Sequence, residues 1–295
     1  MKILVTGGTG FLGHHLQNNQ KHNKNQFFYA SSKDCDLRNQ NDVNAFFSKH
    51  RFDKVIHLAA SVGGIGANQC NPGKFCYENL IMGCNVIESS RITDVKKIVV
   101  VGTVCSYPNI CEVPFKEKNL WNGYPEVTNA PYGIAKKVLL ELLKGYKMQY
   151  DLDYTFLIPV NMYGEHDNFD PDSSHVIPAL IDKILEAKHN NLTSIEVWGT
   201  GKATREFVHA KDVSVAITKA LDTTTDTEAI NVGSGEEISI EKLVEKISRI
   251  SGWTGKIKYL STKPDGQPRR LIDSKRAYDI LQYKPKINLD HGLKN

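Results

Sequence analysis

The chain opens on a short apolar run that leads directly into a glycine-rich turn, and this feature constrains the fold most. A strand is predicted at Ile3–Val5, and glycines follow at positions 7, 10 and 13, where an amphipathic stretch begins. Glycines at this spacing allow a tight turn and let the backbone approach a pyrophosphate at a helix N-terminus. The pattern therefore predicts a strand, turn and helix that bind a dinucleotide.

Apolar runs then alternate with amphipathic stretches along the first two-thirds of the chain. The expected strands are Ile3–Val5, Phe27–Ala30, Val55–Ala59, Ile98–Val101 and Phe156–Pro159. This alternation is typical of βαβ units and predicts an α/β fold, a doubly wound Rossmann parallel sheet with helices on both faces.

The pattern becomes less regular after Gly164, with Asp-, Asn-, Ser- and Gly-rich loops around a short strand at Ile195–Trp198 and a helix near Ile240–Ile250. We therefore expect an NADP-binding Rossmann domain over residues 1–164. Residues 165–295 should form mainly a smaller C-terminal substrate-binding lobe, with part of 207–232 returning to the sheet.

Tyr132 and Lys136 lie four residues apart in a predicted helix, so their side chains share one face. A free tyrosine, with a pKa of about 10, is a poor acid or base at neutral pH, and a nearby cation favours its phenolate. The pair is a candidate for moving a proton on and off a carbonyl oxygen.

The glycine turn at the start and Tyr-x-x-x-Lys well over a hundred residues later resemble the extended short-chain dehydrogenase/reductases. Further segments resemble the GDP-L-fucose synthases, a family of GDP-4-keto-6-deoxymannose 3,5-epimerase/4-reductases. They are residues 60–65, 105–108, 161–169, 174–178, 198–201 with 205–207, and 263–266. In order they cover nearly the whole chain.

This resemblance implies a set of residues that bind NADP(H). They are Gly7, Gly8, Thr9, Gly10, Phe11, Leu12, Gly13, Ser32, Lys33, Asp36, Leu37, Ala59, Ala60, Asn79, Lys136, Pro159, Val160, Asn161, Met162 and His175. Asp36 and Leu37 would lie along the adenine.

Cofactor choice can be argued from the end of the second strand, where an NAD site places an acid for the ribose 2′-hydroxyl. Here Ser31, Ser32 and Lys33 offer hydroxyls and a cation, although Asp34 follows. A 2′-phosphate suits this loop, so NADP(H) is favoured over NAD(H).

Catalytic roles also follow from the resemblance. Tyr132 would protonate the developing alkoxide, with Lys136 lowering the pKa of Tyr132, and Thr103 stands where the family has a serine hydroxyl. Cys105 and His175 match the pair that exchanges protons alpha to the ketone, and the sequence leaves open which is base and which is acid.

The predicted substrate-binding residues are Lys183, Trp198, Arg205 and Asp265. Lys183 and Arg205 can neutralise a diphosphate, and Trp198 offers a flat surface to guanine or the sugar. Asp265 can accept hydrogen bonds from a base edge or hydroxyls. Lys183 stands where the family often has arginine. An ammonium group, which is a point charge, therefore replaces a guanidinium, which can form two parallel hydrogen bonds.

Three alternatives stay open. The substrate could be a GDP-4-keto-6-deoxy-heptose that is epimerised and reduced, or only reduced. A GDP-mannose 4,6-dehydratase is disfavoured, because residues 104 and 105 do not supply its glutamate. A non-catalytic NADP-binding protein is disfavoured because such proteins characteristically lose the tyrosine.

Composition excludes several other classes. A net charge of +4 without a block of like charges disfavours nucleic-acid binding, and no apolar run is long enough for a membrane span. The six cysteines form no C-x-x-C pair, so no metal site or disulfide framework is predicted. With a nucleotide-type motif at the N-terminus in place of a signal peptide, we expect a cytoplasmic protein.

Assembly and chain length complete the expectations. The helix that carries Tyr132 continues through residues 138–143, which hold more apolar side chains than one buried stripe needs, and the family pairs this helix across a dimer seam. We therefore expect a homodimer. Because family members continue into a further helix, the chain should be either a shortened member or a piece of a longer one.

Overall fold

The computed structural model describes residues 1–21, 24–223 and 226–294. Its main feature is a six-stranded, wholly parallel sheet in the order β2-β1-β3-β4-β5-β9. The strands are β1 (Lys2–Thr6), β2 (Gln26–Ala30), β3 (Lys54–His57), β4 (Lys97–Val101), β5 (Asp153–Pro159) and β9 (Ile230–Val232). The α/β, doubly wound fold class is thus confirmed.

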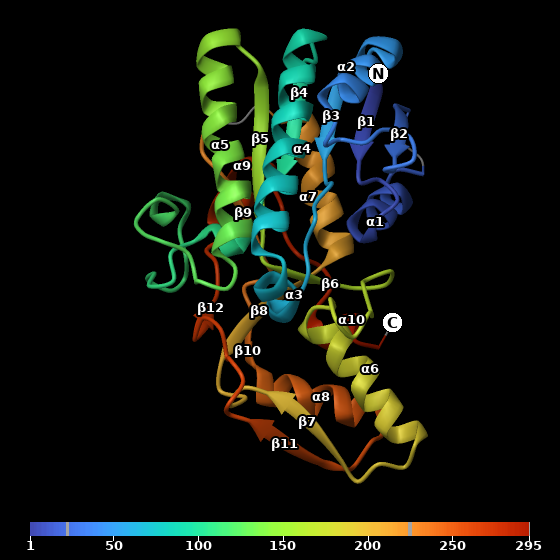
Figure 1. The fold of residues 1–295 in the computed structure, drawn as a ribbon, viewed down its shortest axis with the longest axis vertical. Coiled ribbons are helices and arrows are strands. Elements are labelled where there is room, and N and C mark those ends of the chain that lie inside the picture. Colours follow the sequence, from blue (N-terminus) through green and yellow to red (C-terminus); the bar gives the residue numbers. More distant parts are fainter. Residues whose placement is uncertain (22–23, 224–225, 295) are drawn as a thin grey trace.

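Helices cover both faces of this sheet (Figure 1). On one side α2 (Gln40–His50), α4 (Pro72–Ile92) and α5 (Ala130–Tyr150) pack in a row, and on the other α1 (Phe11–Asn19), α7 (Ala210–Asp222) and α9 (Lys275–Leu281) pack together. All five residues of β4 are buried and four of them are apolar, and Val55 and Ile56 of β3 are buried too, as expected for strands covered on both faces.

A smaller part of the fold lies beyond the carboxyl ends of these strands (Figure 1). A second sheet consists of β6 (Asn161–Tyr163), β8 (Thr204–His209), β10 (Glu237–Ser239) and β12 (Arg269–Arg270), and β7 (Ser194–Trp198) pairs with β11 (Lys256–Leu260). The helices α6 (Val176–His189) and α8 (Ile240–Ser251) complete a second apolar core, with α10 (Leu289–Gly292) at its edge.

The short connections carry the remaining helices. They are α3 (Ile65–Cys70) after β3, and the 3₁₀ turns η1 (Val104–Ser106) and η2 (Glu117–Asn119) after β4. Among the described helices, none combines the length and apolarity that crossing a bilayer demands.

Two expectations need correction. β3 ends at His57 and not at Ala59, because residue 59 bends over the glycine turn: a Cβ on Gly7 would lie 2.8 Å from the Ala59 backbone. Most of the apolar surplus of α5 is covered by the chain itself, since Leu139, Leu140 and Leu143 are buried, whereas Val138 is exposed. Those three leucines therefore do not contribute to an exposed apolar face.

The loop after β4 is held against α5 at a single glycine. A Cβ built on Gly133 would lie 2.3 Å from the carbonyl oxygen of Cys105, and the same segment is fixed by the Ser106 hydroxyl, which donates to the Gly133 carbonyl at 2.8 Å. Only glycine permits this approach, which sets Tyr132 next to η1.

Gly133→Ala should therefore destabilise the protein by about 1–3 kcal/mol, because backbone atoms have to move apart. The matched control is Gly145→Ala in the same helix, where a Cβ meets no atom within 4 Å. The control should gain about 0.5–1 kcal/mol from better helix propensity. Urea unfolding measures both, and equal effects of the two substitutions would contradict this packing.

Candidate active site

The turn after β1 adopts the compact geometry that its glycines allow. Gly7 has φ +65°, the Gly10 amide donates to the Gly7 carbonyl at 3.1 Å, and a Cβ on Gly13 would lie 2.3 Å from the Gly8 carbonyl oxygen. Gly10 caps α1 without a side chain, and Thr9 and Gly10 are exposed. Open amides at a helix N-terminus, behind a turn that leaves no room for side chains, fit a pyrophosphate.

The loop after β2 lies at the same edge of the sheet. Ser32 and Lys33 are exposed, whereas the Asp34 carboxylate accepts hydrogen bonds from the amide and hydroxyl of Ser31 at 2.8 and 2.7 Å. The hydroxyl bond, the larger cause, and the amide bond lower the pKa of Asp34. The Asp34 carboxylate is thus hydrogen-bonded within the loop. Lys33 and Ser32 remain exposed and available to a ligand.

Three other predicted cofactor residues, Asp36, Leu37 and Asn79, make contacts with neighbouring protein groups that hold the loops of the site. The Asp36 carboxylate pairs with Arg38, and Leu37 is buried with its carbonyl accepting from Asn85 at 2.9 Å. Asn79 is buried and bonds both backbone groups of Ser61, so it fixes the loop after β3.

The remaining predicted cofactor positions follow from the strands. Leu12 is buried under the start of α1, which begins at Phe11. Ala59 and Ala60 follow β3, and Pro159 and Val160, at the end of β5, are buried. Met162 and Asn161 are partly exposed in β6. All of these segments meet at the carboxyl edge of the sheet, where ligands of this fold bind.

Tyr132 at the start of α5 and Thr103 in the loop after β4 lie near each other. The Thr103 side chain lies close enough to Tyr132 to influence its pKa, and the Thr103 oxygen accepts the Cys105 amide at 3.2 Å. Both Tyr132 and Thr103 are buried, and one helical turn later Lys136 is 2% exposed.

The expected effect of Lys136 on Tyr132 is not what dominates here. Burial and then Cys105 raise the pKa of Tyr132, which the Thr103 side chain lowers in part, and burial lowers the pKa of Lys136 to about 8. Desolvation is thus the largest cause of both shifts, and neither residue is among the causes that shift the pKa of the other.

Cys105 faces a buried cation that sequence reasoning missed. Nη1 of Arg270 lies 3.7 Å from the Cys105 sulfur and 3.4 Å from Oδ1 of Asn161, and Arg270 is 7% exposed. The side chain of His175, the residue before α6, is exposed. Desolvation by the surrounding protein is the larger cause that lowers the pKa of His175, and the charge of Arg270 is the second. The imidazole is therefore neutral at pH 7.

Arg270 could have been found from the strand period. Successive residues of a strand point to opposite faces, so one of the neighbours Arg269 and Arg270 has to point inward. Arg269 is exposed and pairs with Glu237, whereas Arg270 lies inside.

The structure brings two of the four substrate candidates together. Arg205 is buried and its guanidinium donates to the carbonyls of Thr204, Gln267 and Asp265 at 2.7, 2.6 and 2.9 Å. The Asp265 carboxylate accepts from the amide and hydroxyl of Thr200 at 2.7 and 2.8 Å. Burial, and then the charge of Arg270, lower the pKa of Arg205 to about 9.

The other two candidates lie around this pair. Trp198 is 47% exposed at the end of β7, with the Lys263 ammonium 5.0 Å from its ring centroid. Lys183 is set apart on α6, where its ammonium donates to the Glu196 carbonyl at 2.7 Å.

Cofactor preference gives the test for this part of the site. Lys33→Ala should raise the KM for NADPH about tenfold, as expected for the loss of one charged phosphate contact, and leave the KM for NADH unchanged. The matched control is Lys49→Ala, an exposed lysine at the far end of α2. Steady-state kinetics with both cofactors measures the effect. Equal efficiency of wild-type protein with NADPH and NADH would contradict the preference.

Comparison with known proteins places this geometry in a family. Residues 3–233 match the NAD dependent epimerase/dehydratase family. A GDP-L-fucose synthase of Sinorhizobium fredii is 39% identical over 99% of this chain and 93% of the relative.

Two solved structures are similar over 99% of this chain. A GDP-6-OMe-4-keto-L-xylo-heptose reductase from C. jejuni has a TM-score of 0.90, 31% identity and 95% of its own chain covered. A GDP-L-fucose synthetase from Naegleria fowleri bound to NADP has a TM-score of 0.90, 28% identity and 91% covered. This chain therefore belongs to the NAD dependent epimerase/dehydratase family, in the group that contains the GDP-L-fucose synthases.

Proposed function

We propose that this protein catalyses the NADPH-dependent 3,5-epimerisation and 4-keto reduction of GDP-4-keto-6-deoxy-D-mannose to GDP-L-fucose. The observation that carries the proposal is that two sets of candidate proton-transfer groups lie around the start of α5 and the loop after β4. Tyr132 and Thr103 form one set, and Cys105 and His175, both next to Arg270, form the other. The names and coverage of the similar proteins support the same reaction.

Epimerisation needs a base that removes a proton alpha to the ketone and an acid that returns one on the opposite face. We assign the base to Cys105, because its sulfur lies 3.7 Å from Nη1 of Arg270, inside the loop that also carries Thr103. His175 takes up a proton from solvent and returns it on the opposite face as the imidazolium, which leaves the neutral imidazole behind.

Reduction needs a proton donor at the oxygen of carbon 4. NADPH supplies the hydride to this carbon when bound. Tyr132, still protonated because burial raises its pKa, gives its proton to the developing alkoxide, and the Thr103 hydroxyl donates a second hydrogen bond. Lys136, buried one turn away, is placed to hold the cofactor ribose.

Substrate recognition falls to the cations and the indole of the smaller part of the fold. Arg205 and Arg270 present positive charge to the diphosphate, Trp198 offers its exposed face to guanine or the sugar, and Asp265 fixes the Gly199–Gly201 turn through Thr200. Lys183 is positioned to add a flexible charge at the rim.

A second substrate is favoured by one specific observation, the similarity to the C. jejuni heptose reductase. In this alternative the protein reduces a GDP-4-keto-6-deoxy-heptose, with or without epimerisation. Incubating the purified protein and NADPH with each GDP-keto sugar in turn, and identifying the product sugar, separates the two. Conversion of the hexose more slowly than the heptose would refute the main proposal, and conversion of neither would favour a non-catalytic NADP-binding protein.

Tyr132→Phe should lower turnover by about 100-fold or more, the usual contribution of a positioned acid. The matched control is Tyr124→Phe, an exposed tyrosine in the loop before α5. NADPH oxidation measures both variants. Near-normal reduction by Tyr132→Phe would remove the assignment of Tyr132 as proton donor.

Cys105→Ser should lose solvent deuterium incorporation at carbons 3 and 5 far more than it loses NADPH binding, because a serine hydroxyl is a much weaker acid than a thiol. Cys70→Ser, at an exposed thiol, serves as the control. Mass spectrometry of the product and fluorescence of bound NADPH report the two effects. Deuterium exchange by Cys105→Ser at the wild-type rate would show that Cys105 takes no part in proton transfer.

A homodimer and a cytoplasmic location complete the proposal. Exposed apolar side chains on α4 and α5 support the first, namely Tyr77, Val138, Met148 and Tyr150. All six cysteines are free thiols, which is typical of a reducing compartment.

Light scattering at micromolar concentration should report close to twice the chain mass of 33.1 kDa. Met148→Glu, at an 86% exposed position in α5, should shift the protein toward the monomer, because a charge buried in an apolar seam is unfavourable. A clean wild-type monomer would refute the dimer and leave the catalytic roles intact.

A further inference from the structure

A buried glutamine lies between the loop after β4 and the strand β12. Gln267 belongs to the segment before β12 and is 4% exposed. Nε2 of its side chain donates to the backbone carbonyls of Pro108 and Asn109 at 3.1 and 3.0 Å. Oε1 accepts from Nε of Arg270 at 3.3 Å. The side chain therefore connects the loop that carries Cys105 to the guanidinium of Arg270.

Only one orientation of this amide satisfies all three contacts. Backbone carbonyls can only accept and a guanidinium can only donate, so the nitrogen of Gln267 faces the loop and its oxygen faces Arg270. A carboxylate at position 267 would meet the two carbonyls without a proton, and an apolar side chain would make none of the three bonds. The geometry therefore requires a neutral side chain with both a donor and an acceptor.

A second amide binds the same guanidinium from another element. Asn161 of β6 donates from Nδ2 to the Glu206 carbonyl at 2.8 Å, and its Oδ1 lies 3.4 Å from Nη1 of Arg270. The donor and the acceptor of this amide are thus used in the same way as those of Gln267. Arg270 lies between two amides whose orientations are set by bonds to backbone carbonyls.

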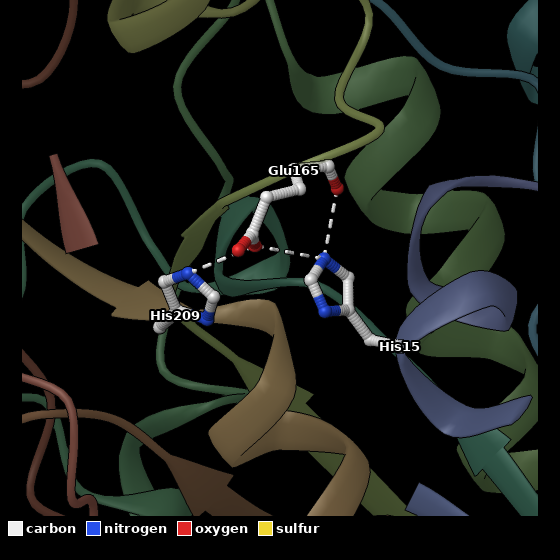
Figure 2. A group of neighbouring side chains, drawn as sticks. All are labelled: His15, Glu165 and His209. Atoms are coloured by element: carbon white, nitrogen blue, oxygen red, sulfur yellow. Dashed lines mark hydrogen bonds and ion pairs between the residues drawn. The ribbon is translucent and has the colours of Figure 1, made fainter. Parts of the chain in front are cut away.

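The strand that carries Asn161 is itself fixed at its end. Figure 2 shows Glu165, in the turn after β6, between His15 of α1 and His209 of β8. Nε2 of His15 donates to the Glu165 carbonyl at 2.8 Å, and a Glu165 carboxylate oxygen lies 3.3 Å from Nε2 of His209. Along its length β6 pairs with β8. The Asn161 oxygen therefore reaches Arg270 from a strand that is held on two sides.

The backbone of Gln267 is also fixed. The guanidinium of Arg205 donates to the carbonyls of Gln267 and Asp265 at 2.6 and 2.9 Å, and the Thr204 amide donates to the Pro268 carbonyl at 2.9 Å. Both donors belong to β8, the neighbour of β12 in the second sheet. The segment before β12 is therefore bound to β8, and the Gln267 side chain extends this support to the guanidinium.

These partners leave the charge of Arg270 in place. Its guanidinium contacts the oxygens of two neutral amides and lies 3.7 Å from the Cys105 sulfur. In the described part of the chain no carboxylate forms an ion pair with Arg270. A neutral amide fixes the position of a cation without cancelling its charge, so a positive charge remains beside the sulfur.

We propose that Gln267 is a positioning residue, which holds the guanidinium of Arg270 against the Cys105 sulfur and so keeps a positive charge beside the group that we assign as the base. The inference rests on that assignment in the proposed function. It requires neither a particular sugar nor a particular position of NADPH.

Alkylation of Cys105 in the full-length protein by two reagents tests this role without cofactor or substrate. Iodoacetate carries a negative charge and iodoacetamide is neutral. Both attack the same sulfur, so the ratio of their rates reports the charge beside it. Mass spectrometry that locates the modified residue separates Cys105, which is partly exposed, from the other thiols.

Arg270→Met should lower the iodoacetate-to-iodoacetamide ratio at Cys105 about tenfold, because it removes a cation close to the sulfur. Gln267→Met changes no charge, yet it should lower the ratio about threefold, because the released guanidinium moves away from the sulfur. The double variant should match Arg270→Met alone, as expected for a residue that acts through Arg270. Gln17→Met, at an exposed position in α1, is the matched control and should keep the wild-type ratio.

An unchanged ratio in Gln267→Met would overturn the proposal, and so would a double variant whose ratio falls below that of Arg270→Met alone. Gln267→Ser removes the same three bonds and leaves room for water, so it provides the same test where Gln267→Met does not fold. Ratios that change as expected, in a protein that brings no deuterium into the GDP-keto sugar, would support the positioning role and refute only the proposed reaction.

Discussion

The close approach of α5 to the loop after β4 is the contact on which the active site depends. Where Gly133 meets the Cys105 carbonyl, the helix supplies Tyr132 and Lys136 and the loop supplies Thr103 and Cys105. A helix that stood farther away by the width of a methyl group would separate the proton donor from its hydroxyl partner. The parallel sheet makes this possible, because it ends its strands at one edge where such loops gather.

Buried positive charge is the second constraint. Lys136, Arg205 and Arg270 are all less than a tenth exposed. The guanidinium of Arg205 is stabilised by backbone carbonyls and not by a carboxylate, and its pKa falls to about 9. Buried cations without an acidic partner are costly for the fold, and such groups concentrate at functional sites. Here they suit a ligand that brings its own negative charge, as a GDP-sugar does.

The sequence predicted the parts of this arrangement that depend on local pattern. The glycine spacing led to the turn before α1, and the apolar runs led to the five strands from β1 to β5. Tyr132 and Thr103 could be paired before any coordinates, because the resemblance supplied their positions. The pattern did not predict the end of β3, which is set by the approach of residue 59 to Gly7.

Features that depend on long-range packing stayed hidden. Arg270 is 165 residues from Cys105, and only the folding of β12 against β8 brings their side chains within 3.7 Å. The sequence pattern predicted that some leucines of α5 would be exposed, but they are buried. Helical periodicity does not indicate how many neighbouring elements pack against a helix. The meeting of His15, Glu165 and His209 required three separate elements to be placed in space.

The central claim is that one site performs both proton exchange and hydride transfer. The most direct measurement is the reaction of wild-type protein with NADPH and GDP-4-keto-6-deoxy-D-mannose in D₂O, followed by mass spectrometry and NMR of the product. The account predicts GDP-L-fucose that carries deuterium at carbons 3 and 5 and protium at carbon 4. A reduced sugar that retains protium at carbons 3 and 5 would contradict it.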